Sequence, residues 1–204
     1  MSNDWAARGT GVLYDVYRTG TEGSDGVWTV RTTPRVVARS GWGSTRGITM
    51  AYDSDGLSRV YRLTSQGLYR YPIKGNGNLG VRLTVQSSGW SGVRNLIYER
   101  SEGIGDNRVD VFLANIKGGA LREYRVLQRR AAFSYRTLRT KGFSFTTIAT
   151  GWCNNSSARP ILGINTSLGR AAVFLDRNPR DSSGSDITGG WTSARNWTNK
   201  AYGQ

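Results

Sequence analysis

The sequence predicts an all-β fold made of repeated units, and three observations lead to this prediction. A tryptophan recurs in similar surroundings at intervals of roughly 40 to 60 residues, the spacing of a repeated supersecondary unit. The residues are Trp5, Trp42, Trp90, Trp152 and Trp191. Glycine is frequent (27 residues) and proline scarce (4), and Val, Thr, Tyr and Trp recur in short runs. No stretch keeps the 3.6-residue apolar period of a helix for three turns.

The second unit shows the plan of a repeat most clearly, because strand and turn signals alternate along it. We expect its strands at residues 47–52, 58–63, 68–73 and 81–87. The third unit repeats the plan, with strands at 95–99, 108–114, 120–127 and 133–139, an insertion within 128–143, and a strand at 145–150 that leads into Gly151-Trp152. The first and fourth units keep about three strands each, and the fifth unit stops after one strand.

Four antiparallel strands in each repeat are typical of a small β-propeller blade. The first strand of a unit is apolar on both faces, as in Val12-Leu13-Tyr14 and Ile161-Leu162-Gly163-Ile164, which suits an inner strand pressed between blades. We therefore predict one propeller domain over residues 1–204, with five blades and four as the alternative. A β-trefoil would have three units, and a β-sandwich gives no reason for a repeated Trp-to-Arg spacing.

Several classes of function are excluded by composition. The chain has one cysteine, Cys153, and no histidine, so it holds no intramolecular disulfide, no Ser-His or Cys-His nucleophile pair and no His/Cys zinc site. The formal net charge is +14, carried almost entirely by arginine. This charge has two interpretations: arginines spread over a solvated surface, or a site for an anionic partner such as a nucleic acid or an acidic polysaccharide.

The chain carries no signals for membrane insertion. No apolar run is long enough to span a bilayer, and the first residues lack the basic and apolar segments of a signal peptide. We expect a secreted protein whose mature chain lacks its signal peptide, with a cytoplasmic protein as the alternative.

The repeats resemble those of tachylectin-like lectins and the related FG-GAP-type repeats. The resemblance rests on residues 40–71 and 88–124, which contain Gly41-Trp42, Gly67-Leu68-Tyr69-Arg70-Tyr71 and Gly119-Ala120-Leu121-Arg122-Glu123-Tyr124. It implies a small propeller with a site for an N-acetylated sugar between each pair of adjacent blades. Lectin repeats usually have an acidic or polar residue just after the tryptophan, and the residues at these positions here are Ala6, Gly43, Ser91, Cys153 and Thr192. Calcium-binding loops of the FG-GAP type are reduced to fragments at 53–56 and 105–110, with too few carboxylates for a calcium site.

The candidate ligand-binding residues are the repeated tryptophans, the arginine that follows each, and two tyrosines. An indole face suits the C–H surface of a sugar ring, and several weak sites bind a multivalent surface tightly. The set is Trp5, Arg8, Trp42, Arg46, Tyr52, Trp90, Arg94, Tyr98, Trp152, Arg159, Trp191 and Arg195. The alternative is structural, with the tryptophans as packing wedges between blades and the arginines as ties to carbonyl groups.

The sequence thus predicts a non-enzymatic, multivalent carbohydrate-binding module without cofactor, metal or catalytic residues. Its partners are glycans, with oligomerisation left open. The alternative is a basic module for an anionic polymer or a protein, in which the stretch Arg122 to Lys141 mixes basic and aromatic residues. A glycosidase would need paired carboxylates. The candidates are Asp15, Asp53, Glu99 and Asp176, which fall near the ends of the first strands. The fourth unit has Asn165, which is not an acid, at the equivalent position.

Overall fold

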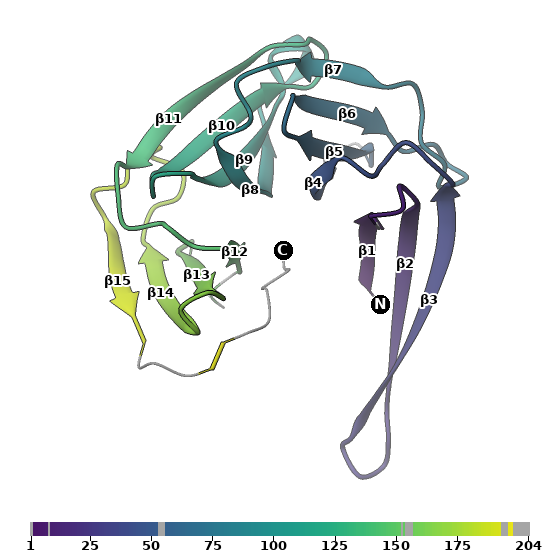
Figure 1. Cartoon of the computed structure of the whole chain (residues 1–204), viewed down its shortest axis with the longest axis horizontal. Helices are drawn as coiled ribbons and strands as arrows, with labels where there is room; N and C mark the ends of the chain where they lie inside the picture. The colour runs from purple at the N-terminus through teal and green to yellow at the C-terminus, as the bar shows by residue number, and fades with distance from the viewer. Residues whose placement is uncertain are drawn as a thin grey trace.

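The computed structural model describes residues 2–7, 9–52, 56–151, 153, 157–192 and 196–197. Among these residues the protein is built from strands, with a single 3-10 turn at Gly105–Asn107. The strands form four separate sheets arranged around a common centre (Figure 1). The predicted all-β propeller is confirmed. Within the described chain the propeller has four blades, the number given as the alternative, and not the expected five.

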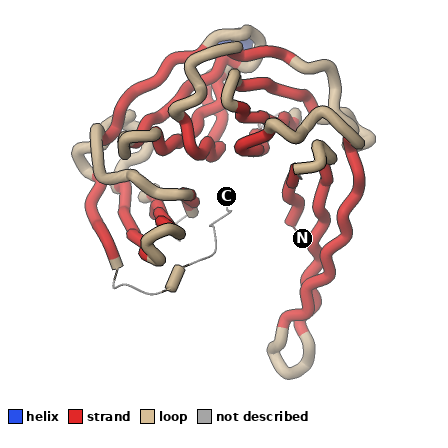
Figure 2. Tube along the Cα trace, in the orientation of Figure 1, coloured by secondary structure: helices blue, strands red, loops and turns tan. Residues whose placement is uncertain are grey.

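Each blade is an antiparallel sheet whose strands follow one another in chain order (Figure 2). Blade 1 contains β1 (Ser2–Ala7), β2 (Leu13–Glu22) and β3 (Trp28–Ala38). Blade 2 contains β4 (Thr45–Tyr52), β5 (Ser58–Thr64), β6 (Leu68–Pro72) and β7 (Leu83–Gln86). Blade 3 contains β8 (Val93–Glu102), β9 (Val109–Ile116), β10 (Leu121–Leu127) and β11 (Phe133–Arg139). Blade 4 contains β12 (Thr147–Thr150), β13 (Arg159–Asn165), β14 (Arg170–Asp176) and β15 (Ile187–Trp191).

The strands expected in the second and third units are confirmed as blades 2 and 3, with ends that differ by a few residues. Their turns contain the glycines that the sequence signals. Gly41 and Gly89, which precede the strands β4 and β8, both have positive φ angles, of 88° and 80°. This left-handed conformation is open to glycine without steric cost, which explains why a glycine stands before each of the two tryptophans.

Blade 4 begins earlier than the tryptophan pattern predicts. Its inner strand is β12, which precedes Trp152, and the predicted inner strand at 161–164 is the second strand, β13. The position of Gly89-Trp90 is taken by Gly142-Phe143, where Gly142 again has a positive φ, of 97°. A phenylalanine in place of the tryptophan therefore concealed the start of this blade.

The two ends of the chain also differ from the predicted units. Val12-Leu13-Tyr14 was expected in an inner strand, but Leu13 lies at the start of β2, the middle strand of blade 1. Trp191, expected to open a fifth unit, is the last residue of β15, the outer strand of blade 4. The hairpin of β2 and β3 continues beyond the body of the molecule (Figure 1), and Trp28 near its tip is 61% exposed.

The core lies in the three seams where consecutive blades meet. In the first seam, between blades 1 and 2, Leu13 packs with Trp42 and Tyr71. In the second seam, between blades 2 and 3, Trp90 packs with Tyr61, Phe112 and other buried residues. The third seam, between blades 3 and 4, is filled by residues that include Phe143 and Phe145. Burying one such aromatic side chain contributes roughly 1.5–3 kcal/mol, so the seams hold the sheets together.

Candidate functional site

The repeated tryptophans occupy the seams as buried side chains. Trp42 is 5% exposed and lies 5.1 Å from the ring of Tyr71, and Trp90 is 1% exposed and lies 4.9 Å from the ring of Tyr124. Trp5 is half-buried against the first-seam cluster. Trp191 is largely exposed, with the Arg170 guanidinium over its ring. The indoles of Trp42 and Trp90 therefore have no face open to a ligand, and their geometry is that of packing wedges.

The arginines that follow Trp42 and Trp90 bond to the backbone of the next blade. Arg46 of β4 donates to the carbonyl oxygens of Ser91 and Val93 at 3.2 and 2.8 Å. Arg94 of β8 donates to the carbonyl oxygen of Phe145, just before β12, at 3.4 Å. Two successive blades thus use the same tie, which accounts for the regular spacing of these arginines. Arg8, Trp152 and Arg195, which belong to the predicted set, lie outside the described residues.

A pocket of about 430 Å³ opens in the third seam. Strand β8 supplies Tyr98, Glu99 and Arg100 on one side. Blade 4 supplies the other side from the end of β12, the start of β13 and the loop after β14. These blade 4 residues are Thr150, Gly151, Ser157, Arg159, Asn178, Pro179 and Arg180. Tyr98 and Arg159 of the predicted set both line this pocket, and Tyr52 does not. The Tyr98 ring, however, packs into the second-seam cluster, and its hydroxyl donates to the Tyr52 carbonyl oxygen of blade 2.

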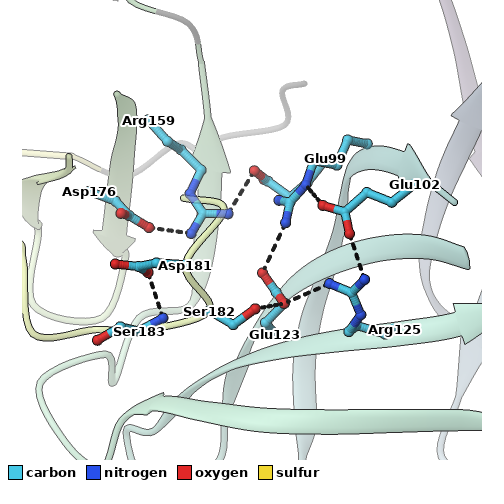
Figure 3. Close-up of polar contacts among 10 residues, drawn as sticks. Glu99, Glu102, Glu123, Arg125, Arg159, Asp176, Asp181, Ser182 and Ser183 are labelled. Atoms are coloured by element: carbon cyan, nitrogen blue, oxygen red, sulfur yellow. Dashed lines mark hydrogen bonds and ion pairs between the residues drawn. The ribbon is translucent and has the colours of Figure 1, made fainter. Parts of the chain in front are cut away.

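Arg159 forms the centre of the pocket floor, where it bridges one acid from each blade (Figure 3). It is 2% exposed, donates to Glu99 Oε2 at 2.8 Å, and makes a second ion pair with Asp176. One guanidinium cannot satisfy both carboxylates completely. Glu99 Oε1, Asp176 Oδ1 and Arg159 Nε are buried without a hydrogen-bond partner. A polar atom buried in this way costs about 1–3 kcal/mol, so the floor retains unused hydrogen-bonding capacity.

The charge state of the floor follows from burial and from these pairs. Burial alone lowers the pKa of Arg159, but the carboxylates of Glu99 and Asp176 outweigh it and hold the pKa above its ordinary value. Arg159 is therefore a permanent cation. Burial raises the pKa of Asp176, and attraction to Arg159 offsets the rise only in part.

A second ion network fixes the wall of the pocket to blade 3. Arg100 pairs with Glu102 and Glu123, and Arg125 pairs with the same two acids (Figure 3). Ser182, in the loop after β14, donates to Glu123 Oε1 at 2.8 Å. The loop of blade 4 that carries Arg180 is thereby attached to blade 3.

The second seam has a comparable polar group but no unpaired carboxylate oxygen. Asp110 accepts from the Tyr61 hydroxyl at 2.6 Å on one oxygen, and from Ser101 and Gln128 at 2.6 and 2.7 Å on the other. Burial, with the Asp110 charge beside it, raises the pKa of Tyr61, which keeps its hydroxyl protonated as the donor. Both oxygens of Asp110 are therefore paired within the protein.

Sequence reasoning missed most of the pocket. Glu99 was noted only as a possible enzymatic carboxylate, and Arg100, Ser157 and Arg180 were not noted at all. Glu99 directly follows the apolar residues Leu96-Ile97-Tyr98 of β8, which is a usable signal because a buried acid requires a partner. Nothing local distinguishes Arg180 from the other arginines, because its position depends on the fold of a loop.

No model of a known protein family matches the chain, and no curated protein sequence matches it. The lectin-like resemblance therefore rests on the repeat residues and the four-blade architecture. In the described part of the chain, no group of three or more His, Cys, Asp or Glu side chains could hold a metal ion. No helix among the described residues has the length and apolar character to cross a membrane.

Proposed function

We propose that this protein is a non-enzymatic, lectin-like carbohydrate-binding propeller of the tachylectin-like type, and that its ligand site is the pocket in the third seam. The observation that carries the proposal is the pocket of about 430 Å³ itself, which brings charged side chains of blade 3 and polar side chains of blade 4 together in one seam. A sugar hydroxyl both donates and accepts a hydrogen bond, so it can pair with the acidic, basic and amide groups of such a lining.

The walls suit a saccharide for a second reason. A few polar groups around a pocket orient its ligand. Arg100 lies on the blade 3 side, and Asn178 and Ser157 supply exposed polar groups on the blade 4 side. The first and second seams are filled by Trp42 and Trp90. We therefore place ligand contact in one seam rather than in every seam.

A glycan array at low and moderate salt tests the proposal. We expect binding to a defined set of glycans that Asn178→Ala weakens by about fivefold, because the variant removes an exposed polar group of the pocket wall. Asn107→Ala is the matched control, since Asn107 is exposed in the 3-10 turn outside the pocket lining. Circular dichroism checks that both variants fold. Silence on every glycan at both salt levels would contradict the proposal and favour a protein partner.

The second candidate is a basic module for an anionic polymer, favoured by the net charge of +14. Intramolecular contacts use several of the arginines between 122 and 141, however. Arg125 pairs with Glu102 and Glu123, Arg129 pairs with Asp106 at 2.8 Å, and Arg122 lies over the ring of Tyr135 at 4.5 Å. Polymer binding would weaken steeply with salt, whereas binding of a neutral glycan would not.

A further inference from the structure

We propose that the third-seam pocket selects sugars that carry a carboxylate, and that Arg180 is the group that recognises it. This inference rests on the proposed carbohydrate-binding function and names its ligand class. The relevant chemistry is a hydroxylated ring that bears one carboxylate, as in a hexuronic acid. Three properties of the pocket support the assignment: the free guanidinium of Arg180, the attachment of its loop, and the excess of acid at the floor.

One arginine of the pocket lining, Arg180, has no counter-ion among the described residues. The lining contains Arg100, Arg159, Arg180 and a single acid, Glu99. Arg100 is compensated by Glu102 and Glu123, and Arg159 by Glu99 and Asp176. Arg180 is exposed and has neither a hydrogen-bond nor an ion-pair partner in the described part of the chain. Its guanidinium is free to bind a carboxylate by two parallel hydrogen bonds.

The acids nearest Arg180 in sequence are engaged in holding its loop. Asp186 Oδ2 accepts from the backbone N–H of Asn178 at 2.7 Å, and Asp181 Oδ1 accepts from the backbone N–H of Ser183 at 2.7 Å. Pro179 is buried, and Ser182 connects the loop to Glu123 of blade 3. The rim that carries Arg180 is therefore attached on both sides, and a ligand would find it already in place.

The acids of the floor determine which end of the ligand can lie deep in the pocket. Glu99 and Asp176 share a single arginine, Arg159, so a ligand carboxylate placed against the floor would be repelled by like charge. A neutral hydroxyl edge in the same place meets no such repulsion. The ligand should therefore direct a hydroxyl edge toward the floor and its carboxylate toward the rim at Arg180.

Titration with two matched sugars tests this orientation. The probes are methyl glucuronide and methyl glucoside, which have the same ring and differ at the carboxylate. Binding is followed in heteronuclear NMR spectra of the full chain, through the backbone amides of the pocket residues Thr150, Gly151 and Asn178. We expect the glucuronide to bind about tenfold more tightly than the glucoside at low salt, the effect of one charge-assisted pair.

Two arginine variants complete the experiment. Arg180→Gln should reduce the affinity for the glucuronide to that for the glucoside and leave the glucoside unchanged. Arg130→Gln, on the exposed turn between β10 and β11 outside the pocket lining, removes the same charge and should change neither affinity. A phosphorylated sugar in a third titration tests the choice of anion, because a guanidinium pairs with phosphate as well as with carboxylate; for a carboxylate site it should bind more weakly than the glucuronide.

The outcomes separate this inference from the function on which it rests. Equal binding of the two sugars, or an Arg180→Gln variant that keeps the preference, would overturn the inference and leave a carbohydrate site in place. A phosphorylated sugar that binds more tightly than the glucuronide would overturn the choice of carboxylate. An absence of shifts with every sugar would overturn both proposals.

Discussion

The second and third seams are built on the same plan, yet one is closed and the other contains a pocket. In the second seam, Trp90 packs with Tyr124 and Phe133, and both oxygens of Asp110 accept hydrogen bonds. In the third seam, a single arginine serves Glu99 and Asp176 and leaves one oxygen of each unpaired.

The difference shows what decides the role of a seam in this propeller. A buried carboxylate that meets a tyrosine, a serine and an amide is satisfied within the protein, and the surrounding side chains can close over it. Two acids that share one arginine cannot both be fully hydrogen-bonded, and in the third seam these acids lie beside a cavity. Repetition of sequence therefore gives repetition of architecture, while the polar groups that each blade contributes differ from seam to seam.

The largest expected effect is on the closed seam. Trp90→Ala should destabilise the fold by about 3–5 kcal/mol, because it leaves a cavity among well-packed aromatic side chains. Trp28→Ala is the matched control, since Trp28 is 61% exposed, and should change stability by less than about 0.5 kcal/mol. Denaturant unfolding of both variants measures the difference. Similar values for the two would mean that Trp90 is not a core residue.

The polar group of the second seam should be nearly as sensitive. Asp110→Asn replaces an acceptor with an amide and disrupts hydrogen bonds from Tyr61 and Gln128, which should cost about 2 kcal/mol. Asp106→Asn makes the same chemical change in an exposed pair with Arg129, where about 0.5 kcal/mol or less is expected. Thermal or denaturant unfolding distinguishes the two. A larger loss of stability for Asp106→Asn than for Asp110→Asn would contradict the statement that Asp110 is the buried acid of the two.

The ion network beside the pocket should make stability depend on pH. Burial by itself raises the pKa of Glu102, but hydrogen bonds from Arg100 and Arg125 outweigh it and hold the pKa below its ordinary value of 4.5. The stabilisation is therefore present above that value and is lost as pH falls through the folded-state pKa. Glu102→Gln should cost about 1 kcal/mol or less at neutral pH, after screening by solvent. Unfolding measured below the folded-state pKa should give equal stability for variant and parent, and a constant difference across the whole range would contradict this account.

The smallest expected effect concerns the ties between blades. Arg46→Gln removes donors to the carbonyl oxygens of Ser91 and Val93 and should lower stability by roughly 1 kcal/mol. It should leave glycan binding unchanged, because Arg46 lies outside the pocket lining. Unfolding and glycan titration of the same variant check both statements. Weaker glycan binding with unchanged stability would show instead that Arg46 contacts the ligand, as the sequence analysis also allowed.

The sequence was informative where turn chemistry and strand period act locally. Strands of blades 2 and 3 could be predicted to within a few residues, because Gly41 and Gly89 mark the start of each repeat. The same reasoning failed at Gly142-Phe143, since the repeat keeps the glycine conformation but not the indole. Arg180 could not be predicted, because its place in the pocket depends on a loop whose anchor, Glu123, lies far away in the sequence.

The central claim is that a ligand enters one seam and that the buried tryptophans keep the first and second seams closed. The stoichiometry of glycan binding in isothermal titration calorimetry tests it most directly, with a monovalent sugar as the ligand. We predict one site per chain. Two or more equivalent sites per chain would contradict the account, because they would require the seams of Trp42 and Trp90 to bind as well.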